Sequence, residues 1–356
     1  MGLERRLEFA NSFRNARNGY MPDTDLWPPY PLKDIDPSHS DPALENLKLP
    51  EEKLRRERVL KTSEIHLACE RAEETNSVLP LIRKAFGEIR QKTSTLAVYF
   101  ELDELFKRDI NGKKLTDFVP FQWGVPCIVN GERAKGIYYI DKPLIKIAEK
   151  QPRTRETLES VAQYGVLPPA IQTGMHEMTH AVQFNFGPSK KIPPELVEAQ
   201  AYRTEQISLA RKPHDTLVND VATSKLYQHL DRRRFDSAVW IIDRFNALGL
   251  SQEEIVQRIH NSGEWDEKKG SWTGLEQKLA MDMKRRDLDE EGLEQTVMAY
   301  DLNRAIDRHT ARIITQGVLR EAFKGEIDKR RREDEKWSKG QSVTVYSRSR
   351  IPALSS

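Results

Sequence analysis

Residues 174–184 read Gly-Met-His-Glu-Met-Thr-His-Ala-Val-Gln-Phe, and within them His176, Glu177 and His180 form the pattern H-E-x-x-H. Residues four apart on an α-helix lie on the same face, so the two imidazoles can both reach one Zn²⁺. Glu177 lies roughly 100° further round the helix, where its carboxylate can take a proton from a water that the metal activates. The pattern therefore predicts a zinc-binding helix with Glu177 as general base.

The pattern is short enough to arise by chance, and the alternative is a surface helix whose histidines bind nothing. Apolar residues around the motif favour a buried helix instead; they are Ile171, Met175, Met178, Val182 and Phe184. Unpaired polar groups on a buried helix are costly, and one metal ion satisfies both histidines and the glutamate. We therefore expect Zn²⁺ as the cofactor.

The composition limits the possible partners. Lys and Arg number 57 against 55 for Asp and Glu, and the resulting net charge of +2 gives no global field that favours nucleic acid or an anionic membrane. No apolar run is long enough to span a membrane, and the N-terminus shows no signal peptide. Only Cys69 and Cys127 occur, too few for a disulfide framework. We expect a cytoplasmic protein whose two thiols pack as small apolar groups.

The order of proline-rich, strand-like, helical and charged stretches divides the chain into four segments. Residues 1–50 read as an N-terminal helix and a Pro-rich arm, and residues 51–190 as an α+β subdomain that carries the H-E-x-x-H helix. Residues 191–328 read as a helical subdomain with the third zinc ligand, and residues 329–356 as a charged, disordered tail. The expected fold class is α+β, with N-terminal helices and a small mixed or antiparallel sheet before a mainly helical C-terminal half.

Strand signals are confined to the first half. Residues 94–102 are rich in β-branched and aromatic residues and are predicted to form a strand. Asn130-Gly131 lies between the strand-like runs 125–129 and 134–140, which predicts a β-hairpin there.

Beyond residue 141 only helices are expected. Gly165 is placed to end one helix, and Pro168-Pro169 to open the motif helix. The predicted helices of the chain run over about 51–74, 78–91, 154–164, the motif helix closed by Gly187-Pro188, 194–211, 215–229, 232–248, 251–261, 272–286 and 290–325.

A catalytic zinc takes three protein ligands, so the two histidines need a partner on the next helix. Glu195, Glu198 and Glu205 compete for this position. Glu195 lies in the first turn, where a carboxylate commonly opposes the helix dipole, and Glu205 lies about two turns beyond Glu198. Glu198 is flanked by Ala199 and Ala201, small residues that let two helices approach closely. Glu198 is the favoured third ligand.

Residues 176–183 followed by residues 198–202 resemble the gluzincin class of zinc metallopeptidases, which have a thermolysin-like fold. The layout is also similar, with a mixed helix and strand half, a hairpin before the motif helix and then a helical half. The resemblance implies a zinc ion held by His176, His180 and Glu198. It is specific only over residues 174–205 and identifies no family within the class.

In that class the last strand forms the edge of the sheet and lines the cleft. The matching segment here is residues 136–140, and the resemblance implies that its backbone pairs with an extended substrate near Tyr138 and Tyr139. One departure concerns the residue four positions after the ligand glutamate. Thermolysin-like enzymes place an aspartate there to orient the first histidine, whereas this chain has Tyr202. Either another residue supplies that contact, or Tyr202 acts near the substrate.

The expected activity is hydrolysis of a peptide bond in a peptide or protein substrate. A donor to the oxyanion is also required, and the candidates are Tyr202, Tyr138, Tyr300, His229 and His309. The alternative function is a non-catalytic scaffold or regulator that holds zinc on the same helices. A nucleic-acid role through Lys329–Arg332 is disfavoured because Glu333, Asp334 and Glu335 follow directly.

Overall fold

The protein is α+β and mainly helical, with a small mixed sheet and two short antiparallel ribbons among the described residues. The computed structural model describes residues 59–75, 77–92, 97–110, 113–114, 119–186, 192–208 and 212–341. Within these ranges, no helix combines the length and the apolar character that a membrane crossing needs. The predicted N-terminal helix, the Pro-rich arm, the Gly187-Pro188 helix end and the chain beyond residue 341 lie outside them.

The helices are α4 (Thr62–Glu74), α5 (Val78–Lys92), α6 (Ala97–Lys107), α8 (Thr154–Tyr164), α9 (Pro169–Phe186), α10 (Pro194–Glu205), η3 (Gln206–Ser208), α11 (His214–Thr223), η4 (Lys225–Tyr227), α12 (Arg232–Ala247), α13 (Gln252–Ser262), α14 (Thr273–Arg285) and α15 (Glu290–Gln341). The strands are β1 (Asp109–Ile110), β2 (Lys113–Lys114), β3 (Phe121–Trp123), β4 (Ile128–Val129), β5 (Glu132–Arg133), β6 (Gly136–Tyr139) and β7 (Leu144–Ile147).

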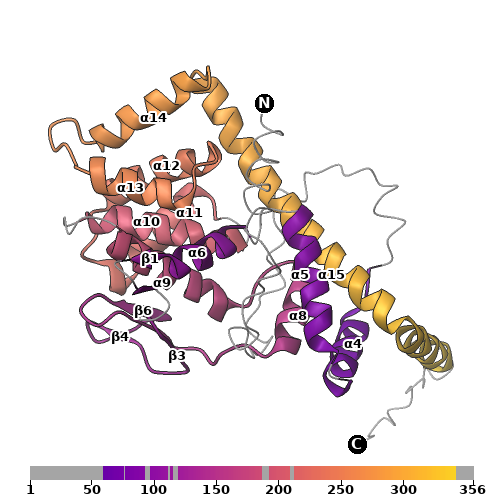
Figure 1. Ribbon diagram of the computed structural model, residues 1–356. Coiled ribbons are helices and arrows are strands. Elements are labelled where there is room, and N and C mark those ends of the chain that lie inside the picture. Colours follow the sequence, from indigo (N-terminus) through magenta and orange to yellow (C-terminus); the bar gives the residue numbers. More distant parts are fainter. Residues whose placement is uncertain are drawn as a thin grey trace, which may run out of the picture.

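Two hydrophobic clusters organise these elements. One joins α4, α5, α6, α8, α9 and the second half of α15, and the other lies among α10 to α14 and includes Leu293 at the start of α15. Figure 1 shows α10, α12, α13 and α14 stacked on one side of α9 and the small sheet on its other side. It also shows α15 as a long diagonal rod beside α4, α5 and α8. The H-E-x-x-H helix therefore lies in the middle of the molecule.

Local sequence signals set the ends of α8 and the start of α9. Gly165 adopts φ 69°, and its N–H donates to the carbonyl of Val161, as expected for a glycine that ends a helix. Pro169 then opens α9, where its missing N–H is not needed. Every residue from 170 to 183 is buried. The prediction of a buried motif helix is confirmed.

The prediction of a strand over residues 94–102 is wrong, because α6 occupies Ala97–Lys107. Val98, Leu102 and Leu105 are buried and recur three or four positions apart, which is the spacing of one helix face. Packing of this face in the larger cluster outweighs the β propensity of the individual residues.

The hairpin at Asn130-Gly131 is confirmed but is shorter than expected. Asn130 has φ 52° and Gly131 φ 83°, the left-handed values of a two-residue turn, and they join β4 to β5. β6 pairs with β7 instead, so a strand follows residue 141 where none was predicted. The burial of β7 alternates along Leu144–Ile147, a period-two signal that is only four residues long. The sheet order is β3-β7-β6, which leaves β6 at an edge of this three-stranded sheet.

The end of α15 differs from the prediction of a disordered tail after residue 328. Phe323 has φ −121° and interrupts the helix close to the predicted end at residue 325, but helix continues to Gln341. Arg331 explains part of this order. Its side chain is buried and pairs with Glu64 of α4, which fixes the continuation against the N-terminal helices.

Candidate metal centre

Two packed helices bring three potential metal ligands together. His176 and His180 lie one turn apart on α9, and Glu198 faces them from α10. The Nε2 atom of His176 lies 3.5 Å from one carboxylate oxygen of Glu198, and that of His180 lies 3.7 Å from the other. One ligand atom from each residue falls within 4.8 Å of the other two. The three residues favoured from the sequence therefore converge on one point.

The two remaining histidine nitrogens point away from this point, toward oxygen atoms. Nδ1 of His176 lies 3.2 Å from a carboxylate oxygen of Glu205, and Nδ1 of His180 lies 3.0 Å from Oε1 of Gln183. The acceptor at Nδ1 of His180 favours the tautomer that keeps its proton there and leaves the Nε2 lone pair free. Nδ1 of His176 is buried and has no hydrogen bond of good geometry among the described residues. Both imidazoles direct Nε2 toward Glu198.

The three competing glutamates of α10 have separate positions. Glu198 lies in the cluster, and Glu205 lies behind His176. Glu195 is buried elsewhere, where its carboxylate accepts the backbone N–H of Asp231 just before α12. Glu205 takes the place of the aspartate that thermolysin-like enzymes have at the position of Tyr202. It lies seven residues after Glu198, two turns along the helix, and its carboxylate contacts His176.

Glu177 lies beneath the edge strand β6. A Cβ atom built on Gly136 would lie 2.7 Å from Oε1 of Glu177 and 2.7 Å from Cγ2 of Thr173, so only a glycine allows the strand this close. The backbone of Tyr138 lies close enough to lower the pKa of Glu177. Strand β6 therefore confines this side chain.

Burial and mutual charge shift the pKa values of the centre. Burial raises the pKa of Glu177 to about 8, and the negative Glu198 and Glu205 add to this. Burial lowers the pKa of His176, but the carboxylates of Glu198 and Glu205 outweigh it and raise that pKa well above its ordinary value. Burial lowers the pKa of His180. The carboxylates of Glu198 and Glu205 thus favour positive charge at the centre.

Aromatic residues form one wall of the centre. The ring of Tyr202 meets the ring of His176 edge-on at 4.8 Å, and the Tyr227 ring lies 5.7 Å from that of Tyr202. Burial raises the pKa of Tyr202, and His229 lies close enough to lower the pKa of Glu198. Tyr227, on the short helix η4, was not singled out from the sequence.

The other predicted residues divide between β6 and α15. The Tyr138 hydroxyl accepts a hydrogen bond from Asn185 at 2.8 Å, and the Tyr139 side chain is exposed on the strand. Tyr300 and His309 lie on α15, which packs mainly on α4, α5, α8 and α12, and the Tyr300 hydroxyl accepts a bond from Arg304. Helices α9 and α10, which carry the centre, are not among the main packing partners of α15, the helix of Tyr300 and His309.

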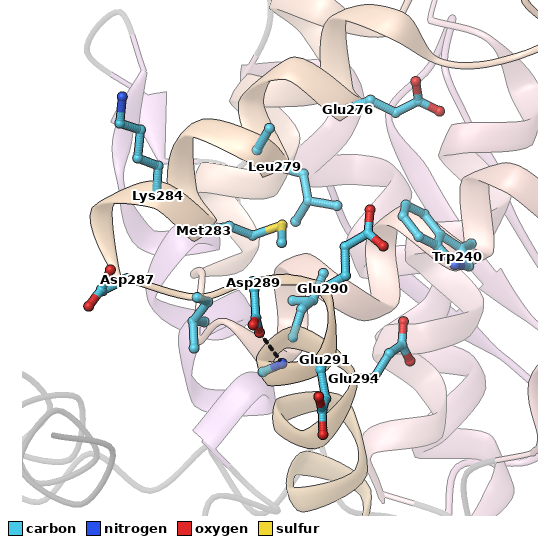
Figure 2. Close-up of a pocket in the computed structure, with 14 residues that line it drawn as sticks. Trp240, Glu276, Leu279, Met283, Lys284, Asp287, Asp289, Glu290, Glu291 and Glu294 are labelled. Carbon is cyan, nitrogen blue, oxygen red and sulfur yellow. Dashed lines mark hydrogen bonds between the residues drawn. The ribbon is translucent and has the colours of Figure 1, made fainter.

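A cavity lies elsewhere, at the junction of α12, α14 and α15, and its volume is about 1010 Å³ (Figure 2). We call it the acidic cavity; its charged lining residues are Glu276, Lys284, Asp287, Asp289, Glu290, Glu291 and Glu294. Asp289 accepts the backbone N–H of Gly292 at 2.8 Å in the first turn of α15, and Glu294 pairs with Arg244. These two carboxylates have structural partners, and the cavity contains no histidine.

Comparisons of the chain with protein-family models, with curated proteins and with solved structures give no match.

Proposed function

We propose that this protein is a zinc-dependent peptidase with a zincin-like fold, in which Glu177 acts as general base. One observation carries the proposal: the Nε2 atoms of His176 and His180 and the carboxylate of Glu198 converge, with Glu177 buried beside them. The arrangement of an edge strand across the motif helix, followed by a helix with the third ligand, supports the gluzincin resemblance.

The residues fit zinc. Tetrahedral coordination with ligand bonds of about 2.0–2.1 Å puts neighbouring ligand atoms roughly 3.3 Å apart. The Nε2 atoms of His176 and His180 lie 3.5 and 3.7 Å from different oxygens of Glu198, and one ligand atom from each residue lies within 4.8 Å of the other two, so the three side chains have to close by a short distance around an ion. Oε2 of Glu198 is buried and has no hydrogen bond of good geometry among the described residues. Two imidazoles and one carboxylate are also a donor set that catalytic zinc uses.

A bound zinc ion supplies a Lewis acid that polarises a carbonyl and brings the pKa of a coordinated water to about 7. The Glu177 carboxylate takes the proton of the attacking water and transfers it to the leaving nitrogen. Its high pKa falls when positive charge is placed near it, toward the range where a general base is effective at neutral pH. The close approach of Gly136 on β6 leaves the Glu177 carboxylate little room to turn away during both transfers.

Tyr202 and Tyr227 are the donors best placed to stabilise a developing oxyanion. A tyrosine hydroxyl has one O–H that it can donate to an acceptor such as an oxyanion. The Tyr202 ring touches His176, and the negative Glu198 is close enough to raise the pKa of Tyr227, so both lie on the metal side. Tyr138 is less suited, because its hydroxyl is engaged with Asn185.

Strand β6 is the proposed binding surface for the substrate backbone. It forms the edge of its sheet among the described strands, and it crosses α9 at Glu177. An edge strand has unpaired backbone groups that an extended peptide can pair with. Tyr139, exposed at the end of β6, is positioned to contact substrate side chains.

The test measures zinc and activity separately. Wild type is expected to contain a single zinc ion by elemental mass spectrometry, and His176→Ala to lose it. Glu177→Gln is expected to keep zinc but to cleave a denatured protein substrate about 10²–10⁴-fold more slowly. Glu195→Gln is the matched control, since glutamine also accepts the Asp231 N–H. Zinc without cleavage in wild type would favour the non-catalytic scaffold instead.

A further inference from the structure

A chain of buried side-chain amides begins at His180 and crosses three helices. Oε1 of Gln183 contacts Nδ1 of His180, and Nε2 of Gln183 donates to Oε1 of Gln200 at 2.9 Å. Nε2 of Gln200 then donates to Oε1 of Gln252 at 3.1 Å. The exposed fractions of the three glutamines are 0%, 0% and 2%. The chain therefore runs through the dry interior from α9 to α10 and α13.

The orientation of the first amide is determined by its neighbours. Nε2 of Gln183 also lies 3.0 Å from the backbone carbonyl of Val197, which can only accept. The amide nitrogen must therefore face Val197, and Oε1 must face His180. Because Oε1 only accepts, His180 donates from Nδ1 and keeps its Nε2 lone pair directed at Glu198.

The far end of the chain is also fixed. Nε2 of Gln252 donates to Asn246 at 3.1 Å, and Thr204 donates its hydroxyl to Oε1 of Gln252 at 3.1 Å. The backbone N–H of Gln252 donates to the carboxylate of Glu101 on α6 at 2.6 Å. Each side-chain amide nitrogen of the three glutamines therefore has at least one acceptor. A buried polar network with its donors satisfied in this way holds one geometry.

We infer that Gln183, held by Gln200 and Gln252, is a positioning residue that sets the zinc affinity of His180. The inference rests on the proposed zinc site. It goes beyond that site by naming the neutral amide of Gln183 as the group that orients His180. Glu205 lies behind His176, and Glu177 and Glu198 are two further carboxyl groups of the centre. An uncharged acceptor at Gln183 orients the second imidazole without adding a fourth carboxyl group to the centre.

A purely structural role would also explain buried glutamines, so the test needs a matched control. Gln172 lies on the same helix, is 2% exposed, and donates its amide to the carbonyl of Leu167. Its partner lies in the turn before α9 and not on a histidine. Gln172→Ala therefore removes a comparable buried amide without touching His180.

The experiment measures zinc affinity by competition with a chromophoric chelator and thermal stability with and without zinc. Gln183→Ala is expected to weaken zinc binding about 10–100-fold, because contacts behind metal ligands typically contribute this much. Gln200→Ala is expected to weaken it less, by about 3–10-fold, since Val197 still orients Gln183. Gln172→Ala is expected to lose stability but to bind zinc as wild type does.

Each outcome has a distinct meaning. If Gln183→Ala and Gln200→Ala bind zinc as tightly as Gln172→Ala, the positioning role is wrong while the zinc site stands. If wild type binds no zinc, the proposed function and this inference both fail. If Gln183→Ala does not fold, Gln183→Asn and Gln200→Ala carry the test, and unchanged zinc affinity in both contradicts the inference.

Discussion

Carboxylates gather in two regions of this protein, the centre between α9 and α10 and the acidic cavity at the junction of α14 and α15. The cavity has more of them, but Asp289 accepts a backbone N–H, Glu294 pairs with Arg244, and both are exposed. The centre has fewer, but Glu177 is buried and Glu198 faces two imidazole nitrogens. Chemistry is therefore indicated by burial and convergence of lone pairs, whereas the number of acidic groups indicates little.

The largest expected effect is a loss of zinc affinity, which substitutions in the α9–α10 centre cause and substitutions in the acidic cavity do not. Glu198→Ala removes a proposed direct ligand and is expected to weaken zinc binding by more than about 100-fold, beyond the loss typical of contacts behind a ligand. Glu294→Ala, in the acidic cavity, is expected to leave zinc binding unchanged. Chelator competition on both variants gives the comparison. Equal affinities would place the metal outside the α9–α10 centre.

The second prediction concerns a buried carboxylate away from zinc. Burial raises the pKa of Glu101 from 4.5 to about 7. The folded protein therefore holds a proton that the unfolded chain loses, and the free energy of unfolding falls by about 3 kcal/mol as the pH rises through this window. Glu101→Gln is expected to remove that part of the pH dependence.

Urea unfolding at pH 5 and pH 8 measures the effect for wild type and Glu101→Gln. Other titrating groups cancel when the two proteins are compared. The same loss of stability in both proteins would show that Glu101 ionises in the folded state as it does in the unfolded chain.

The third prediction uses two glycines that each lie beside a carboxylate. In Gly136→Ala the new methyl group overlaps Glu177, which cannot move freely because it is buried. A misplaced base is expected to lower kcat by about 10–100-fold with zinc still bound. In Gly292→Ala the nearest atom is 3.1 Å away, on the exposed Asp289, so kcat is expected to stay at the wild-type value. Steady-state kinetics and zinc analysis on both variants decide the point, and equal kcat values would contradict it.

The smallest expected effect belongs to the acidic cavity. Glu294 is 56% exposed and pairs with Arg244, whose guanidinium also lies 3.6 Å from the Trp240 ring centroid. Glu294→Ala is expected to lower the free energy of unfolding by about 0.2–1 kcal/mol, the usual range for exposed ion pairs. Thermal unfolding at low and high salt measures it, and a loss above this range would mean that the cavity contributes more to stability than its exposure implies.

Local patterns predicted much of the centre. Three signals each act within a few residues: the H-E-x-x-H spacing, the small residues beside Glu198 and the helix-breaking Gly165. The sequence alone was therefore sufficient to predict which three residues come together and where the preceding helix ends. Glu205 and Gln183 also had a local signal, since they lie two turns after Glu198 and one turn after His180. Gln252 and Tyr227 had none, because only packing of distant helices brings them to the centre.

The two wrong predictions about the fold, a strand in place of α6 and a disordered tail in place of the end of α15, have a related cause. Residues 94–102 are rich in β-branched and aromatic residues, but the helix face that α6 buries in the larger cluster overrides their β propensity. The charged residues after 328 look disordered in isolation, and burial of Arg331 against Glu64 gives them a partner far away in sequence.

Helix α15 also has a consequence for the order in which the chain folds during synthesis. Leu60 donates to Gln316 across 256 positions, and Glu64 meets Arg331 across 267. The N-terminal helices α4, α5 and α8 therefore emerge from the ribosome long before their packing partner exists. Until then their apolar faces are open to aggregation or to chaperones, and native closure of this part follows the synthesis of α15.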